Sequence, residues 1–407
     1  IGSDALAAVN ITAPLFMIAA GIGLMFGVGG SVVASIHLSQ GKRKAANINI
    51  TQALVFSAIL ILIMSALCFY FVEPLGRFLG SSDKLLPYVI EYMSWYVPFL
   101  VFYEILNISM FYIRLDGSPN YAMMCNATAA ILNILLDYIF IFEFGWGMMG
   151  AAFATSLGTV VGGLMTLVYL MHYSHDLRLY RIKLSRKSLR MTFRNIGYMV
   201  KLGNSAFVSE ASIACMMFLG NYVFIRNLGE DGVAAFSIVC YFFPIIFMVC
   251  NAIAQSVQPI ISYNFGAGQP ERVRKALRLS LRTALICGIC FFIFTTLCCR
   301  NIVALFIDRS YSAFDIAVNG IPYFGIGFIF FAINMIGIGY YQSIERGQRA
   351  TIITLLRGVV FMLIGFFVLP PILGVPGIWL AVPLAELLTT LYIIGIYFKD
   401  RFIVRRR

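Results

Sequence analysis

The residue whose chemistry stands out in this chain is Asp137, a single acid inside a long apolar run. The stretch from Asn126 to Thr155 reads NATAAILNILLDYIFIFEFGWGMMGAAFAT. An ionised Asp at the centre of a bilayer-spanning helix costs about 2.5–3.5 kcal/mol on insertion scales, so it should face the protein interior or a water-filled cavity. We therefore interpret Asp137 as part of an ion or proton pathway. The alternative is a structural acid paired with a neighbouring side chain.

Two polar side chains accompany Asp137. Asn133 precedes it by four residues, so both side chains point to the same face of a helix. Thr155 lies early in the next apolar run, across a glycine-rich break. Carboxylate, amide and hydroxyl oxygens together suit a hard monovalent cation or a proton. The alternative is that Asn133 and Thr155 only join two helices by hydrogen bonds.

Glu210 is a second carboxylate within an apolar run, in the C-terminal half of the chain. We interpret it as a candidate for ion coupling or for recognition of a cationic substrate. Glu104 and Glu386 are weaker candidates, because each could pair structurally with a basic residue, for example Arg114 or Arg357.

The composition indicates the kind of protein that must position these acids. The chain has 407 residues, of which 60% are hydrophobic and 12% charged, and its mean hydropathy is +0.88. A soluble domain carries about twice that charged share. Apolar runs of at least 18 residues recur, which indicates a polytopic all-α membrane protein and not a barrel of short strands. No HExxH, GxSxG or Walker motif is present, so we expect no enzyme.

Hydropathy predicts eleven membrane spans, and the loops between them alternate in charge. The expected spans are roughly 10–37, 50–73, 88–113, 121–142, 149–172, 202–225, 233–262, 283–303, 320–342, 351–370 and 377–398. All but five of the 30 Lys and Arg residues fall on one side; the exceptions are Arg77, Lys84, Arg226, Arg300 and Arg309. The positive-inside rule places the basic side, including the C-terminus, in the cytoplasm. The net charge of +12 is therefore a topology signal, and we expect no nucleic-acid partner.

The chain also contains an internal repeat. Residues 2–41 align without gaps on 229–268, and the same offset returns at Gly150/Gly377. We predict two like halves in parallel orientation. The sixth span has no repeat partner in the sequence, so we expect a full protein of two six-helix lobes whose first helix is absent here. The predicted parts are an N-terminal lobe, a basic cytoplasmic linker, a C-terminal lobe and a basic cytoplasmic tail, at 1–175, 176–201, 202–398 and 399–407 respectively.

Several motifs together carry a family resemblance that covers essentially the whole chain. They are GSDALAAVNITAPLF, GKRKAA, RLDGSPNYAM, NILLDYIFIFEFGWGMMGAA, QPIISYNFGAGQPERV and YYQSIERGQRAT. In order and spacing the chain resembles the multidrug and toxic compound extrusion (MATE) family of cation-coupled exporters. The resemblance implies two six-helix lobes around a central cleft, alternating access, and export of organic or amphipathic compounds against entry of Na⁺ or H⁺.

The resemblance also implies two possible cation sites. Asn133, Asp137 and Thr155 match three members of an N-lobe site whose fourth member, a first-helix Asp, would lie in the missing segment. Glu210 matches the Glu of a C-lobe site, but Asn334 stands where that site carries an Asp. Asn334 is therefore only a possible secondary polar site, and the departure favours the N-lobe for coupling.

We accordingly predict a secondary active efflux transporter that exchanges inward Na⁺ or H⁺ for outward organic compounds. No cofactor is expected beyond the coupling ion, and no metal beyond a possible Na⁺ at Asp137. The expected partners are the lipid bilayer and small organic substrates, and the expected form is a monomer in the plasma membrane. The alternative is a lipid-linked precursor flippase of similar two-lobe build. Its pyrophosphate substrate would favour a basic cavity, whereas the intramembrane charges here are mainly acidic.

Overall fold

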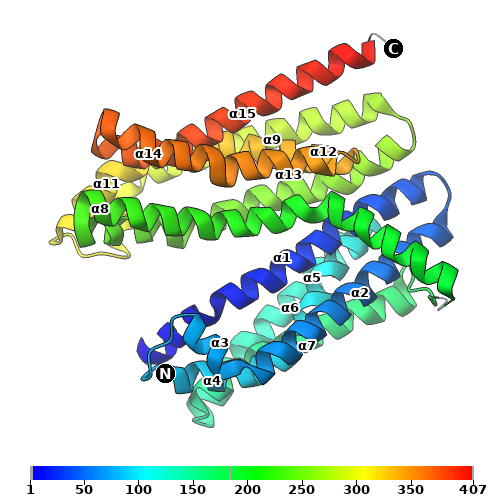
Figure 1. Cartoon of the computed structure of the whole chain (residues 1–407), viewed down its shortest axis with the longest axis horizontal. Helices are drawn as coiled ribbons and strands as arrows, with labels where there is room; N and C mark the ends of the chain where they lie inside the picture. Colours follow the sequence, from blue (N-terminus) through cyan, green and yellow to red (C-terminus); the bar gives the residue numbers. More distant parts are fainter. Residues whose placement is uncertain (1–2, 183–184, 406–407) are drawn as a thin grey trace. The chain divides into compact units, whose positions relative to one another are not determined.

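The computed structural model describes residues 3–182 and 185–405, and every regular element in those residues is a helix. The chain divides into two compact units, Ile1–Phe207 and Val208–Arg407, whose helices are labelled in Figure 1. The all-helical membrane fold that the sequence predicts is thereby confirmed.

The N-terminal unit is built from α1 to α7 and the first part of α8. The helices are α1 (Ser3–Ser39), α2 (Arg43–Tyr70), α3 (Val72–Phe78), α4 (Leu86–Tyr96), α5 (Leu100–Leu115), α6 (Pro119–Asp137), α7 (Gly147–Val168) and α8 (Arg186–Gly266). A short 3₁₀ turn joins α4 to α5, so the two together form one bent span. The helix α8 begins within the stretch that the sequence assigns to the basic linker, so the second half of that stretch is helical.

The C-terminal unit contains the rest of α8 and seven further helices. They are α9 (Pro270–Leu297), α10 (Cys299–Ala304), α11 (Ser312–Gly325), α12 (Gly327–Ser343), α13 (Gly347–Leu355), α14 (Phe361–Leu373) and α15 (Val375–Arg405). Its interior is filled by large apolar side chains, among which Phe224 stacks on Phe236 and meets Trp379 edge-on.

The number of spans follows from the long helix α8. By length and composition, nine helices of the described residues can cross a membrane, or ten if the bent pair α11 and α12 counts as one span. With 81 residues, α8 would be about 120 Å long if straight, far more than one bilayer needs. The helical geometry breaks at Gly229, which adopts φ 67° and ψ −157°, a conformation that glycine tolerates best. Counted as two spans, α8 brings the total to the eleven that the sequence predicts.

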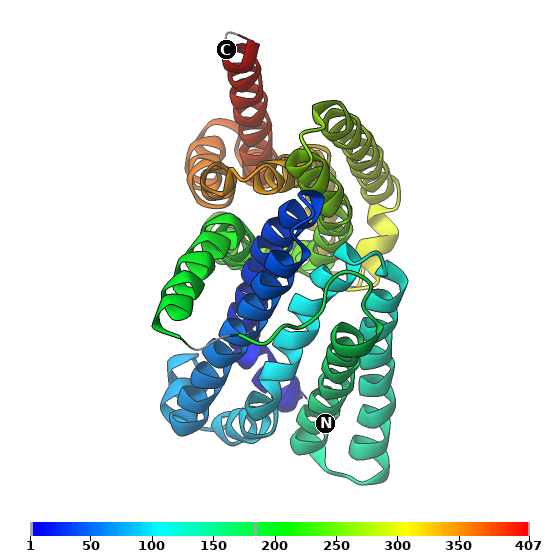
Figure 2. The ribbon, with the colours of Figure 1, turned by 90° about the vertical axis from the view of Figure 1, so that its right-hand side faces the viewer.

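The hairpin of α6 and α7 positions the candidate site. The two helices run side by side and are joined by a short turn at one end (Figure 2). A Cβ atom at Gly158 of α7 would lie 2.6 Å from the backbone oxygen of Ala129 in α6, so only glycine permits this close approach. Small residues at such contacts are typical of helix packing in lipid.

Candidate functional site

Directly after Asp137 the helix α6 widens into a π-helical turn, Tyr138–Glu143. The amide of Phe144 donates to the carbonyl of Ile139 at 3.0 Å, five residues back. Such turns occur often at functional sites because they displace the side chains on one side relative to the other. Here the turn separates Asp137 from the end of the hairpin.

Asn133, Asp137 and Thr155 lie together on the facing sides of α6 and α7. The Asn133 amide nitrogen donates to the Asp137 carboxylate at 3.1 Å and to the Thr155 hydroxyl at 3.2 Å. The Thr155 hydroxyl in turn donates to the Ala151 carbonyl at 3.0 Å. We call these three residues the Asp137 cluster. The sequence places Asn133 and Asp137 on one helix face and Thr155 across the turn, and the hydrogen bonds agree with this placement.

The Asp137 cluster carries no internal counter-charge. Within the described chain, Asp137 forms no ion pair, and its Oδ1 atom is buried without a hydrogen-bond partner. Tyr92 of α4 lies close enough to Thr155 and Asp137 to interact with both electrostatically. An unsatisfied carboxylate oxygen in such a place is costly unless a cation or a proton reaches it. The cluster therefore has the acceptor that a coupling ion requires.

The donor set also fits Na⁺. Asp137 and Thr155 present oxygens, and a half-turn of the Asn133 amide would replace its nitrogen by its oxygen. Oxygen ligands of this kind suit a hard cation. The three residues are only partly buried.

A different polar cluster lies inside the C-terminal unit. Asn334 of α12 donates to the Glu386 carboxylate at 2.7 Å and to the Glu386 carbonyl at 2.8 Å. The Thr390 hydroxyl lies 2.9 Å from the Asn334 side-chain oxygen. The Arg357 Nε atom is 3.6 Å from the second Glu386 oxygen, and its guanidinium stacks over Phe331 at 4.9 Å. We call Asn334, Arg357, Glu386 and Thr390 the Glu386 cluster.

The Glu386 cluster is closed, and its charges cancel. Asn334 is 0% exposed, and Arg357 and Glu386 are each 4% exposed. The possible pairing of Glu386 with Arg357 that the sequence raises is present in the structure. Asn334 belongs to this pair as a hydrogen-bond donor.

Glu210, which the sequence singles out as a candidate coupling residue, belongs to neither cluster. Glu210 lies on α8, partly buried, and in the described chain it has no hydrogen bond or ion pair. Asn334 is bonded to Glu386 and Thr390 instead, and no hydrogen bond joins it to Glu210 in the described chain.

The sequence-based suggestion that Glu104 pairs with Arg114 is wrong. Both Glu104 side-chain oxygens are buried without a partner among the described residues. Its Oε2 atom would lie 2.7 Å from a Cβ at Gly23 of α1. Ten residues separate the two side chains, which is about 15 Å along one helix and too far for contact.

Comparison with known proteins extends over nearly the whole chain. The profile of the MatE family matches residues 1–139 and 205–375. A protein of Shewanella oneidensis named FAD transporter is 28% identical over 400 residues, which cover 95% of this chain and 85% of that protein. The multidrug export protein MepA of Staphylococcus saprophyticus is 26% identical over 418 residues, which cover 99% of this chain and 88% of that protein.

A solved structure is also similar. The crystal structure of MATE in complex with MaL6 superposes with a TM-score of 0.90 at 22% identity, covering 100% of this chain and 90% of that one. At this identity the likeness supports the fold.

A multi-pass helical membrane transporter is the class of protein that this fold and these comparisons define. The family match spans well over half of the chain. The chain belongs to the MATE family, as its motifs suggest, and it is a compound efflux transporter and not an enzyme. The flippase alternative finds no support in these comparisons.

Proposed function

We propose that this protein exports organic compounds in exchange for Na⁺ or H⁺ entering through the Asp137 cluster. The observation that supports this most is the buried Asp137 oxygen without a partner, in a cluster that holds no basic residue. The coupling cation binds and neutralises Asp137 in one state of the transport cycle and dissociates from it in the other state. Coupling requires that ion and substrate prefer different states of the protein.

We propose the plasma membrane as the location, with the basic loops and the C-terminus in the cytoplasm, and a monomer as the working unit. The charge asymmetry of the loops supports this orientation. The cargo is an amphipathic organic cation in this proposal, because the intramembrane charge outside the Arg357 pair is acidic. The similarity to a protein named FAD transporter makes FAD a second cargo to be tested.

The experiment uses proteoliposomes loaded with ethidium or FAD, with a sodium gradient and a pH gradient applied separately. We expect one of the two gradients to drive ethidium export by the native protein, and Asp137→Asn to abolish that component. Glu143→Gln is the matched control, since Glu143 is an exposed acid at the end of the same hairpin.

Equal gradient-driven export by Asp137→Asn and the native protein would refute the assignment of Asp137. Export of FAD but not ethidium would refute the cationic cargo and leave the coupling site standing.

A further inference from the structure

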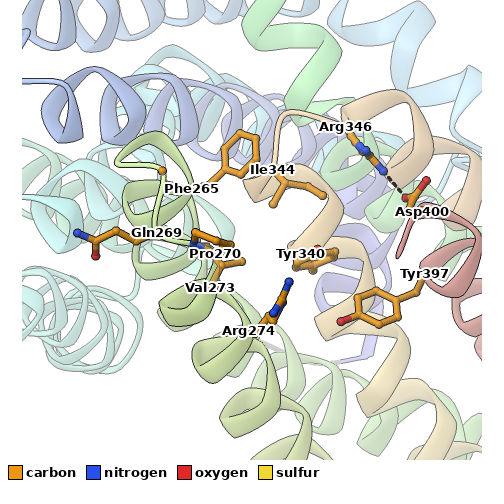
Figure 3. A pocket seen from close by; sticks show the side chains of 11 residues that line it. Phe265, Gln269, Pro270, Val273, Arg274, Tyr340, Ile344, Arg346, Tyr397 and Asp400 are labelled. Carbon is orange, nitrogen blue, oxygen red and sulfur yellow. Dashed lines mark hydrogen bonds and ion pairs between the residues drawn. The ribbon is translucent and has the colours of Figure 1, made fainter. Parts of the chain in front are cut away.

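One end of the C-terminal unit contains a cavity that the transport cycle proposed above does not use. Its volume is about 430 Å³, within the range of pockets that hold small molecules. It lies where α8 leads into α9, where α12 leads into α13, and beside the end of α15 (Figure 3). The residues that line it are Phe265, Gly268, Gln269, Pro270, Val273, Arg274, Tyr340, Ile344, Arg346, Tyr397 and Asp400.

The walls of this cavity combine guanidinium groups with aromatic rings. Tyr340 and Tyr397 meet with their ring centres 6.1 Å apart, and Arg274 extends from α9 toward Tyr340 in Figure 3. Arg346 and Asp400 form an ion pair on the same side of the cavity as Tyr397 (Figure 3). The polar groups therefore converge on one side of the cavity, while Val273 and Ile344 keep another side apolar.

The cavity has an excess of positive charge. Asp400 is the acid in its wall, and it is held by two arginines, Arg346 and Arg349. Arg274 pairs at 2.7 Å with Glu271, three residues before it, and both of these side chains are at least half exposed. Exposed pairs of this kind are weak, so Arg274 is available to a stronger anion. The N-terminus of α9, at Pro270, adds partial positive charge from its free amide groups.

The position of the cavity selects the kind of anion. It lies at the ends of candidate membrane spans and beside basic loops, so we expect it at the boundary between the hydrocarbon and headgroup layers of a membrane. Tyrosines are enriched at that level, and basic pockets between helix ends bind the headgroups of anionic lipids. Guanidinium groups favour phosphate because they donate two hydrogen bonds in matching geometry.

We propose that this cavity binds a phosphate ester, with Arg274 as its main ligand and the two tyrosines as hydrogen-bond donors. A phospholipid headgroup would supply the phosphate together with an acyl stem for the apolar wall. A soluble phosphate ester would supply the phosphate alone. Either ligand would contact α9, α12 and α15 at once and hold their ends together.

The test uses the purified protein in detergent, stripped of lipid, and measures its thermal unfolding temperature. Phosphatidylglycerol, phosphatidylcholine and glycerol 3-phosphate are added in separate titrations. We expect phosphatidylglycerol to raise the unfolding temperature more than phosphatidylcholine does. Arg274→Gln should weaken the apparent affinity for phosphatidylglycerol about tenfold, the usual effect of losing a charged hydrogen bond.

Arg272→Gln is the matched control, because Arg272 lies on the same helix turn, is exposed and does not line the cavity. A response to glycerol 3-phosphate equal to that of the lipid would assign the site to a soluble ligand. Equal loss of affinity in Arg274→Gln and Arg272→Gln would overturn the proposal, because it would show only diffuse attraction to a basic surface. So would a native protein whose unfolding temperature is raised by none of the three ligands.

Discussion

The Asp137 cluster and the Glu386 cluster use the same three kinds of side chain, an acid, an asparagine and a threonine, yet they differ in one decisive member. The C-terminal cluster contains Arg357, 3.6 Å from its acid, and the N-terminal cluster has no such cation in the described chain. A guanidinium beside an acid supplies its counter-charge from within the protein. An acid without one must take its counter-charge from solution, which is what coupling to an ion gradient requires.

The two clusters also differ in access. Arg357 and Glu386 are almost fully buried, whereas the members of the Asp137 cluster are only partly buried. Burial makes a charge pair costly to break, because the partner that remains is a charge without water or counter-ion. The comparison therefore favours a structural role for Glu386 and supports the coupling role that we propose for Asp137.

The largest expected effect comes from breaking the C-terminal pair. Arg357→Gln leaves Glu386 buried without its counter-charge, and we expect the protein to lose about 3–5 kcal/mol of stability. Thermal or denaturant unfolding in detergent measures this loss. The double variant Arg357→Gln with Glu386→Gln should recover most of it. A single variant that unfolds like the native protein would show that Arg357 is not the counter-charge.

The next effect comes from giving the N-terminal cluster the cation that it lacks. Asn133→Lys places an ammonium beside Asp137, where a second cation at about 4 Å is opposed by roughly 4 kcal/mol. We expect the ion concentration for half-maximal transport to rise at least about a hundredfold. Asn133→Gln keeps the amide and serves as the control. If Asn133→Lys transports with unchanged ion dependence, Asp137 does not take its counter-charge from solution, and the proposed difference between the two clusters is wrong.

A smaller effect is expected at Thr155. Thr155→Val keeps the shape of the side chain but removes an acceptor of the Asn133 amide, at a cost of about 0.5–1.5 kcal/mol. This corresponds to roughly a two- to tenfold weaker apparent affinity for the coupling ion. Initial rates of gradient-driven export across an ion titration measure it, with Thr159→Val further along α7 as the control. A Thr155→Val titration curve that overlays the native one would exclude the hydroxyl from the ion site.

The smallest effect concerns Glu104, a buried acid of the N-terminal unit. Neither of its oxygens has a hydrogen-bond partner in the described chain, so Glu104→Gln removes no bond. Both side chains leave buried polar atoms unpaired at a cost of about 1–3 kcal/mol, and we expect the two costs to cancel to within about 1 kcal/mol. Glu104→Ala should cost more because it leaves a cavity. Thermal unfolding of the two variants tests this. A large loss of stability in Glu104→Gln would show that Glu104 has a charged partner, as Glu386 does.

Much of this fold follows from the sequence because long apolar runs have few structural solutions in a bilayer. Hydropathy predicted the helices, and the four-residue spacing placed Asn133 beside Asp137. Sequence could not show that Gly158 draws α6 against α7, because close packing depends on which faces meet. It left the pairing of Glu386 with Arg357 as one option, and it gave no sign that Asn334 completes that pair, since these residues come from three different helices.

The π-helical turn after Asp137 has a consequence for how the hairpin tolerates change in length. An α-helix rotates by about 100° for each residue, and a π-turn carries one residue more than the α-helical spacing. Deleting a single residue from Tyr138–Glu143 would convert the turn to ordinary α-helix and keep the backbone bonded. Because the π-turn fits its extra residue into a single turn, this deletion would leave the direction of the Asp137 carboxylate nearly unchanged relative to the Gly147 end of α7. The hairpin can therefore lose one residue from Tyr138–Glu143 and keep the acid in place, whereas deleting one residue between Asn133 and Asp137, in regular α-helix, would rotate the two side chains by about 100° relative to each other.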